Sequence, residues 1–211
     1  MKKILLLSLL SLAGLLSSTA QAESTFVPAA VTGSTAQARV DFSITIPQVL
    51  YLRVGTSSGI AATDGTVNGI DFTIPAANVG DGTNFPGVGG DLSAGAVTVR
   101  VYGNGGNISL NSTTTGLMTN VAGDTIPWSQ ISVAAAPLAS GTAGFTNAAI
   151  THPAFNATFG LGTATVLTAT AKVVRVEGKW TYSFLNSIPF APGVYGTSAR
   201  NGRVAYIATQ L

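Results

Sequence analysis

The residues best suited to chemistry are a serine flanked by glycines and a single histidine. Gly55, Ser57 and Gly59 fit the pattern Gly-x-Ser-x-Gly, in which a nucleophilic serine lies on a sharp turn between a strand and a helix. Residues 60–65 lead into an Asp-Gly turn where that helix is required. His152 lies in a Thr-His-Pro loop, and no carboxylate stands at a recognisable spacing to orient it. We therefore expect no catalytic residues and no enzymatic activity.

Metal and cofactor sites are equally poorly supported. One histidine and no cysteine exclude a zinc site built from nitrogen and sulfur ligands. Oxygen ligands for calcium could come from either of two loop sets: Asp64, Asn68 and Asp71, or Asp81, Asn84 and Asp91. Neither set follows the spacing of a known calcium loop, and Asp-Gly pairs usually form turns. Residues 103–106 are followed by a predicted strand, whereas a phosphate-binding loop precedes a helix. We expect no metal and no cofactor.

The first 22 residues have the pattern of a secretory signal peptide. Lys2 and Lys3 precede an apolar run over residues 4–16, and Ala20-Gln21-Ala22 forms a small-x-small cleavage site. The pattern predicts export through the inner membrane and a mature chain that begins at Glu23. The apolar run is too short for a stable membrane span, so we expect no membrane anchor. Without cysteine, the exported chain must gain its stability from burial or from partners.

The charge of the chain argues against nucleic acid as a partner. The sequence has ten basic and eight acidic residues, and two of the basic ones are Lys2 and Lys3. The mature chain therefore keeps eight of each and has no basic stripe for phosphates. Such low charge also weakens repulsion between copies, which permits close packing of subunits.

Alternating apolar residues predict an all-β fold. The clearest pattern begins at residue 38, where four apolar residues alternate with polar neighbours: Val40, Phe42, Ile44 and Ile46. Pro47 interrupts the run, and a second alternating run follows over residues 50–54. Further strands are predicted over residues 67–74, 96–102, 107–111, 126–135, 163–176, 180–185 and 203–209. The predicted organisation is a signal peptide over 1–22, an N-terminal extension over 23–37 and a single β-sandwich domain over 38–211.

Turn residues place the predicted connections between these strands. Asn104-Gly105 predicts a hairpin, and Glu177-Gly178-Lys179 predicts a second. Residues 75–94, rich in Gly, Asp, Asn and Pro, and residues 137–154, rich in small residues, are predicted to be long loops. Trp128 is expected in the core, while His152 is expected to be a solvated loop residue.

The order of these features resembles the subunits of chaperone-usher fimbriae, and most closely the cysteine-free pilins of the colonisation-factor (alternate) class. Those pilins open with a charged residue, alternating β-branched residues, a proline and an aliphatic run, which residues 39–52 resemble. They end with a Gly-x-Tyr turn before a last strand that carries an aromatic residue. Gly193-Val194-Tyr195 and Tyr206 are similar to that ending.

The resemblance implies an immunoglobulin-like antiparallel β-sandwich that lacks its final strand and is completed by donor-strand exchange. The function implied is that of a structural subunit, or pilin, of a bacterial fimbrium at the cell surface, contributing to adhesion. Its partners would be further copies of itself in a head-to-tail polymer, a periplasmic chaperone and an outer-membrane usher. The donor side chains would be Val40, Phe42, Ile44 and Ile46.

Two departures from the family leave alternatives open. About 15 residues precede the alternating run, whereas family donor strands begin almost at the mature terminus. The exported segment could therefore be residues 26–31, with residues 40–46 belonging to the domain's own sheet. Residues 197–202 also interrupt the closing strand. The alternative function is a self-contained secreted or periplasmic binding module, whose exposed aromatic platform would draw on Tyr51, Trp128 and Trp180, although each suits a core position better.

Overall fold

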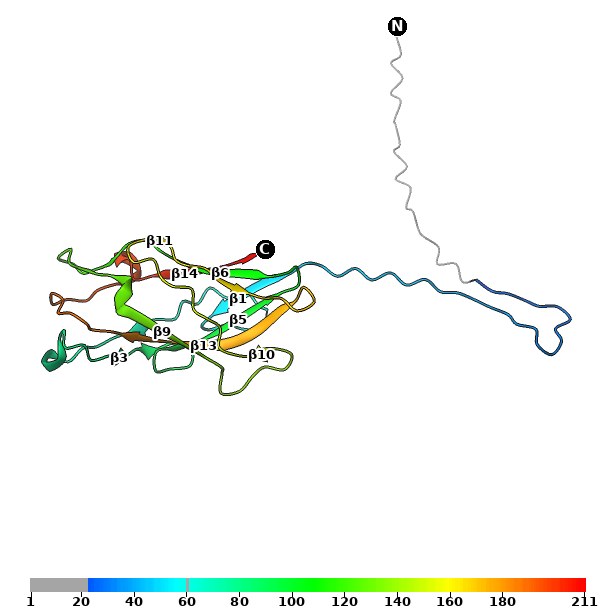
Figure 1. Ribbon diagram of the computed structural model, residues 1–211, viewed down its shortest axis with the longest axis horizontal. Coiled ribbons are helices and arrows are strands. Elements are labelled where there is room, and N and C mark those ends of the chain that lie inside the picture. The colour runs from blue at the N-terminus through cyan, green and yellow to red at the C-terminus, as the bar shows by residue number, and fades with distance from the viewer. Residues whose placement is uncertain (1–22, 60) are drawn as a thin grey trace, which may run out of the picture. The chain divides into compact units, whose positions relative to one another are not determined.

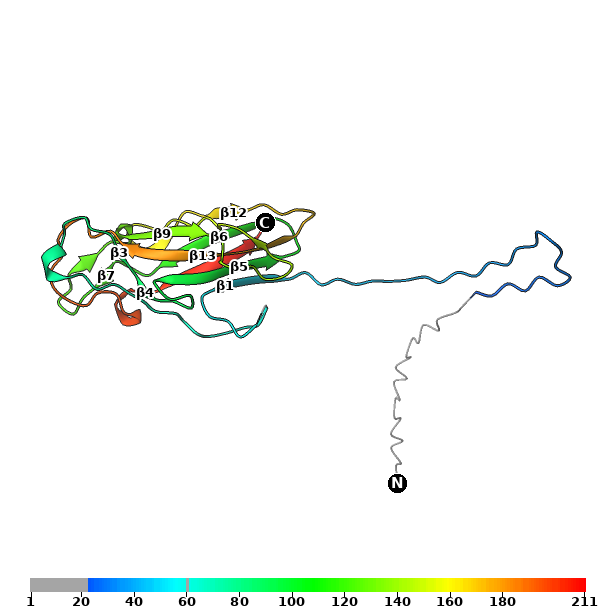
Figure 2. The same cartoon turned by 90° about the horizontal axis from the view of Figure 1, so that it is seen from below.

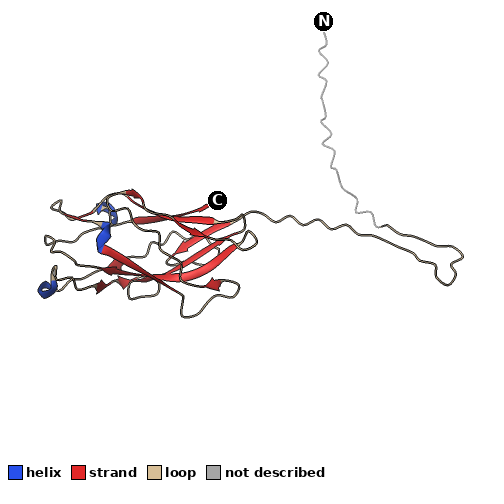
Figure 3. Ribbon diagram, in the orientation of Figure 1, coloured by secondary structure: helices blue, strands red, loops and turns tan. Residues whose placement is uncertain are grey.

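The computed structural model describes residues 23–59 and 61–211, so the predicted signal peptide lies outside the described residues. The chain divides into two units, one ending at Ile46 and a compact one over Pro47–Leu211. The all-β prediction is confirmed, since the described chain is built of strands with three short 3₁₀ turns (Figure 3). None of its helical turns is long and apolar enough to cross a membrane.

The strands are β1 (Leu50–Val54), β2 (Ile70–Asp71), β3 (Phe85–Pro86), β4 (Val88–Gly89), β5 (Ala96–Gly103), β6 (Ile108–Thr114), β7 (Met118–Thr119), β8 (Thr125–Ile126), β9 (Ile131–Ala136), β10 (Thr146–Asn147), β11 (Gly160–Leu161), β12 (Thr165–Leu167), β13 (Val174–Phe184) and β14 (Val204–Gln210). The 3₁₀ turns are η1 (Ala76–Asn78), η2 (Trp128–Gln130) and η3 (Ser198–Arg200).

Two main sheets make up the compact unit. The first has the order β1-β5-β13, and β9 and β10 pair with the opposite edge of β13. The second is centred on β6, which pairs with β14 on one side and with β11 and β12 on the other. In Figure 1, β6, β11 and β14 form the upper layer, and β5, β13 and β10 form the lower one. Every pairing except that of β10 with β13 is antiparallel.

The core lies between the two sheets. Val97 and Val99 of β5 and Trp180 of β13 pack with Leu110 of β6, so both sheets contribute side chains to one cluster. A second cluster joins Val101, Ile108 and Val174. Trp128 is 4% exposed, as expected for a core residue. Alternation in β5 and β13 therefore marks the packed face correctly.

Neither predicted hairpin forms. Asn104-Gly105 connects β5 in the first sheet to β6 in the second, so the two strands that it joins do not pair. Glu177-Gly178-Lys179 lies inside β13, which runs unbroken from Val174 to Phe184. Gly178 is required there because a Cβ atom would collide with the carbonyl oxygens of Ala148 and Ala136. Glycine stands at this position because neighbouring backbone approaches closely, and not because the chain turns there.

The reversal that feeds β13 lies earlier in the chain. Thr170 and Val173 exchange two backbone hydrogen bonds of 2.9 Å. Ala171 and Lys172 between them have φ values of 50° and 65°, which side chains other than glycine seldom adopt. Neither residue is typical of such a turn, and so composition gave no signal for it.

The strand predicted from residue 38 begins only at Leu50. Residues 23–49 form no strand, and Phe42 and Ile44 are 88% and 83% exposed. A strand needs a partner edge for its backbone groups, and no described residue supplies one to this segment. The alternation specifies a face for burial but no partner within the chain.

Candidate functional site

Strand β14 has one free edge among the described residues. It pairs with β6 over its whole length, from Val204 opposite Thr114 to Gln210 opposite Ile108. The N–H of Leu211 donates to the carbonyl oxygen of Asn107 at 2.8 Å, which continues this ladder. Because antiparallel pairs alternate, Val204, Tyr206 and Ala208 direct their backbone N–H and C=O groups away from β6. No described strand receives those groups.

Strand β1 has a matching free edge. It pairs with β5 on one side only, and the N–H of Gly55 donates to the carbonyl oxygen of Thr98 at 2.7 Å at the end of that ladder. By the same alternation, Leu50, Leu52 and Val54 direct their backbone groups to the side away from β5. No described strand pairs with that side.

The two free edges border one region of incompletely covered core. β1 and β14 lie side by side, each at the end of its own sheet (Figures 1 and 2). Leu52 and Ala208 are half-buried and pack against both core clusters, while Leu50 is 43% exposed. We call β1, β14 and the apolar side chains between them the open edge. It offers backbone groups for a further strand and apolar contacts for that strand's inward side chains.

The predicted donor side chains lie in the other unit and are exposed to solvent. Val40, Phe42, Ile44 and Ile46 are 67%, 88%, 83% and 76% exposed. Four such residues in one segment of seven are unusual on an isolated chain, because exposed apolar side chains normally occur singly. The segment has the pattern of a strand without a sheet.

Residues 23–37, the alternative exported segment, have a different local structure. The hydroxyl of Thr25 donates to the carbonyl oxygen of Gln37 at 2.7 Å, and Glu23 lies 3.4 Å from Arg39 in an ion pair. The stretch between folds back through turns at residues 28–29 and 32–33. Phe26 and Val31 are exposed, but the turn at residues 28–29 separates them. Residues 38–46 are the longer uninterrupted run.

His152 is half-buried in an aromatic cluster, contrary to the expectation of a solvated loop residue. Its ring centroid lies 4.6 Å from that of Trp180 and 4.7 Å from that of Phe155. Its Nε2 atom shares a 2.8 Å hydrogen bond with the hydroxyl of Tyr206, which bonds in turn to Tyr182 at 2.8 Å. The loop packs over the sheets, a long-range contact that a lone His-Pro pair does not signal. His152 thereby fixes Tyr206, a residue of the open edge.

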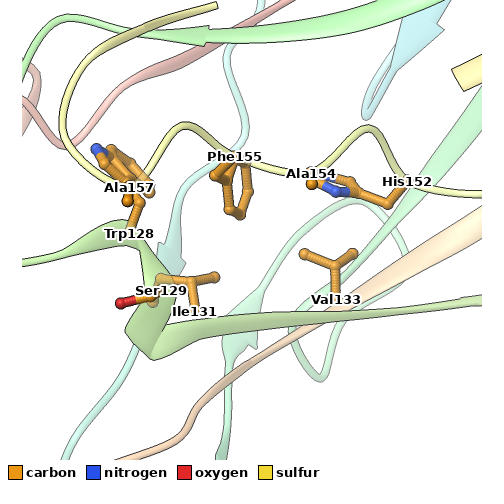
Figure 4. A pocket seen from close by; sticks show the side chains of 8 residues that line it. All are labelled: Trp128, Ser129, Ile131, Val133, His152, Ala154, Phe155 and Ala157. Carbon is orange, nitrogen blue, oxygen red and sulfur yellow. The ribbon is translucent and has the colours of Figure 1, made fainter. Parts of the chain in front are cut away.

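The side chains around His152 line a cavity of about 320 Å³ (Figure 4). Its wall combines residues of η2 and β9 with the loop that follows residue 150: Trp128, Ser129, Ile131, Val133, Ala154, Phe155 and Ala157. The Nε1 atom of Trp128 already donates to the carbonyl oxygen of Gly116 at 2.7 Å. The wall is therefore mainly apolar and has no convergent set of charged groups.

Ser57 and His152 are not brought together. The hydroxyl of Ser57 lies 3.2 Å from that of Tyr51 and donates to the carbonyl oxygen of Gly59 at 2.9 Å. His152 instead bonds to Tyr206. A nucleophile and its base must lie within hydrogen-bond reach, and these two have separate partners.

Two carboxylates of the second calcium hypothesis, Asp81 and Asp91, serve the local fold. Asp81 accepts hydrogen bonds from the side chains of Asn78 and Asn186. Asp91 accepts one from the backbone N–H of Thr98 and forms a 3.1 Å ion pair with Arg53. Among the described residues, no three His, Cys, Asp or Glu side chains gather as a metal site.

Acid destabilisation is expected to depend partly on His152. Burial lowers the pKa of His152 from 6.5 to about 4. Between those values the unfolded chain binds a proton that the folded protein does not, so stability falls as the pH drops through this window, by about 3 kcal/mol. His152→Gln removes the titration but keeps a polar partner for Tyr206. Between pH 7 and pH 4, the free energy of unfolding measured by urea denaturation should fall less for His152→Gln than for the parent protein. An equal fall in the two proteins would contradict this assignment.

Comparison with family models, with curated proteins and with solved structures finds no match to this chain.

Proposed function

We propose that the protein is a structural subunit of a bacterial surface filament, in which each copy donates its N-terminal segment as a strand to the open edge of the next. One observation carries the proposal. Among the described residues, the same chain has a sheet edge without a partner strand beside half-covered core and, in a separate unit, a solvent-exposed segment with the alternation of a strand. The edge lacks a partner strand, and the segment lacks a sheet to pair with.

The dimensions of the two halves agree. Residues 40–46 number seven, and β14 is seven residues long. A strand added to β14 would place Val40, Phe42, Ile44 and Ile46 on one face, toward the half-covered core. Their full burial would contribute roughly 6–12 kcal/mol, an upper bound before the cost of ordering the segment. Backbone hydrogen bonds to the free edge would add affinity, and the side chains would set the register.

We further infer that the sheets form an incomplete immunoglobulin-like sandwich. In that fold one sheet has the strand order A-B-E-D, and the other contains C, F and G. The order β1-β5-β13-β9 corresponds to the first, and β6 paired with β14 corresponds to C and F. The free edge of β14 lies where strand G would pair. This correspondence gives the donated strand a defined place.

Assembly partners follow from the resemblance to chaperone-usher pilins. An unpaired edge beside exposed core can pair with any strand and is an aggregation hazard. A periplasmic chaperone would cover the edge until exchange, and an outer-membrane usher would order the subunits as they reach the cell surface. Two of the three side chains suggested for a self-contained binding module, Trp128 and Trp180, are 4% and 0% exposed. That alternative therefore has no aromatic platform in its support.

The test separates the donor from the acceptor. A chain without residues 23–46 is mixed with a peptide that spans residues 38–48, and binding is followed by calorimetry and by the melting temperature. The peptide is expected to bind and to raise the melting temperature, whereas the same peptide with Phe42→Asp and Ile44→Asp is expected to do neither. A full-length chain that stays monomeric at high concentration, with residues 40–46 protected from hydrogen exchange, would overturn the proposal.

A further inference from the structure

We propose that Asn104 and Pro47 prevent the N-terminal segment from filling the open edge of its own chain, and so reserve that edge for a second copy. The inference rests on the proposed function and adds a device that chooses between self-completion and exchange. It concerns residues 46–49, the stretch between the predicted donor residues and β1. Both halves of the exchange belong to one chain, so a barrier to self-completion is needed for polymers to form.

Asn104 binds the backbone just ahead of β1. Its Oδ1 atom accepts a hydrogen bond from the N–H of Val49 at 2.8 Å, and its Nδ2 atom donates to the carbonyl oxygen of Pro47 at 2.9 Å. Its own backbone N–H donates to the carbonyl oxygen of Val49 at 3.4 Å. These contacts follow directly on the pairing of Leu50 with Gly103. Residues 47–49 are thus held as a continuation of β1 along β5.

Self-completion would require this stretch to turn back. A segment that fills the open edge lies beside the free side of β1. Because residues 40–46 directly precede β1 in the chain, they must fold back to reach that side and would run antiparallel to β1. The reversal would have to fall between Ile46 and Leu50, because β-hairpin connections are commonly two to five residues long. Those are the residues that Asn104 holds extended. A turn at this point would break its bonds to Val49 and Pro47.

Pro47 extends the constraint by one residue. Its ring disfavours the helical conformation for the preceding residue, so Ile46 is biased toward an extended backbone. A reversal is then possible only before Ile46, within residues 43–45. That would place Ile44 in the turn and remove Ile46 from the inserted strand. A self-inserted segment would keep only two of the four apolar side chains, Val40 and Phe42.

A segment from a second copy has no such restriction. It does not have to connect to the β1 that it lies beside, so all seven residues from Val40 to Ile46 can pair while its own residues 46–49 remain extended. Only self-completion loses the burial of two apolar side chains and the hydrogen bonds of Asn104. Exchange between copies is therefore favoured over closure within one chain.

The test uses a cysteine pair, which is unique because the natural chain has no cysteine. Ser43→Cys is combined with Ala205→Cys, Ile207→Cys or Thr209→Cys on the outward side of β14, so that every register is sampled. Isotope-labelled and unlabelled proteins are mixed in equal amounts before oxidation. Links between copies give labelled-to-unlabelled pairs, whereas links within one chain give none.

The parent protein is expected to form mixed pairs. Asn104→Ala with Pro47→Ala is expected to raise the share of within-chain links about tenfold, since the hydrogen bonds that oppose the turn are lost. Asn156→Ala is the matched control, because the side chain of Asn156 bonds to Thr158 and Leu161, both within five positions of it in the chain. Thermal melts followed by circular dichroism establish that each variant folds. If Asn104→Ala does not fold, Pro47→Ala alone is tested, and a smaller rise in the share of within-chain links is expected.

An unchanged share of mixed pairs in the folded variants would overturn the role of Asn104 and Pro47 but leave exchange intact. The absence of any link between Ser43→Cys and β14, in the parent as well as in the variants, would instead overturn the proposed function.

Discussion

Replacing Glu177 by alanine is expected to lower the free energy of unfolding by about 3–5 kcal/mol, because it leaves a buried guanidinium without its counter-charge. Glu177 is 0% exposed and Arg100 is 5% exposed. The Nη2 and Nε atoms of Arg100 donate to the same carboxylate oxygen at 2.7 and 3.0 Å. Burial by itself raises the pKa of Glu177, but the hydrogen bonds from Thr142 and Arg100 outweigh it and hold the pKa below its usual value.

The same carboxylate anchors the loop over the outer face of the first sheet. The backbone N–H of Thr142 donates to Glu177, and the ring of Phe145 lies 4.7 Å from the guanidinium of Arg100 and 4.6 Å from that of Arg175. Loss of Glu177 would release this loop as well as the charge. The effect of the substitution should therefore exceed that of a simple loss of one ion pair.

Urea denaturation of matched variants measures this effect. Glu23→Ala is the control, since its ion pair with Arg39 is exposed and should contribute no more than about 1 kcal/mol. Replacing both Arg100 by methionine and Glu177 by leucine is expected to recover much of the loss, because neither charge is then left unpaired. A cost below about 1 kcal/mol for Glu177→Ala would contradict the assignment.

Alternation in the sequence located strands such as β5 and β14 but not their partners, and residues 40–46 alternate without forming a strand. Val97, Val99 and Val101 of β5 belong to the core clusters, and every second residue of β14 is half-buried, as a local period of two predicts. Which strand lies beside which depends on contacts distant in sequence. In the sequence alone, Glu177-Gly178-Lys179 and Asn104-Gly105 both have the pattern of hairpin turns, although Gly178 allows a close approach to β13 and Asn104-Gly105 joins two sheets. A glycine occurs both in turns and where two backbones approach closely, so its presence does not distinguish between the two.

The candidate site likewise could be predicted only in part from the sequence. The alternating apolar segment could be read from the sequence because Val40 to Ile46 carry that pattern within seven positions, while its role as a donor stays a prediction. The open edge could not, because it is defined by the sides of β1 and β14 that no described strand pairs with, and a sequence does not reveal an unpaired edge. The sequence around His152 predicts a solvated residue for a related reason, since its contacts with Trp180 and Tyr206 arise only when the loop folds over the sheets.

Ile44→Asp is expected to abolish association of the subunits while leaving the compact unit folded. Ile44 is 83% exposed in the isolated chain, so an aspartate there costs the folded monomer little. In the proposed exchange this side chain enters apolar surroundings, where a carboxylate has no partner. The lost burial and the cost of desolvating the charge together should weaken association by about a hundredfold or more.

Ser43→Asp is the matched control for this substitution. It adds the same charge at the adjacent position, but Ser43 lies on the opposite face of the predicted strand and would remain in solvent. Sedimentation velocity should show assemblies with Ser43→Asp and monomers with Ile44→Asp, at equal melting temperatures by circular dichroism. Val31→Asp tests the alternative exported segment and is expected to leave association intact. If residues 40–46 instead belonged to the domain's own sheet, Ile44→Asp would unfold the monomer, because the buried aspartate would then act within one chain.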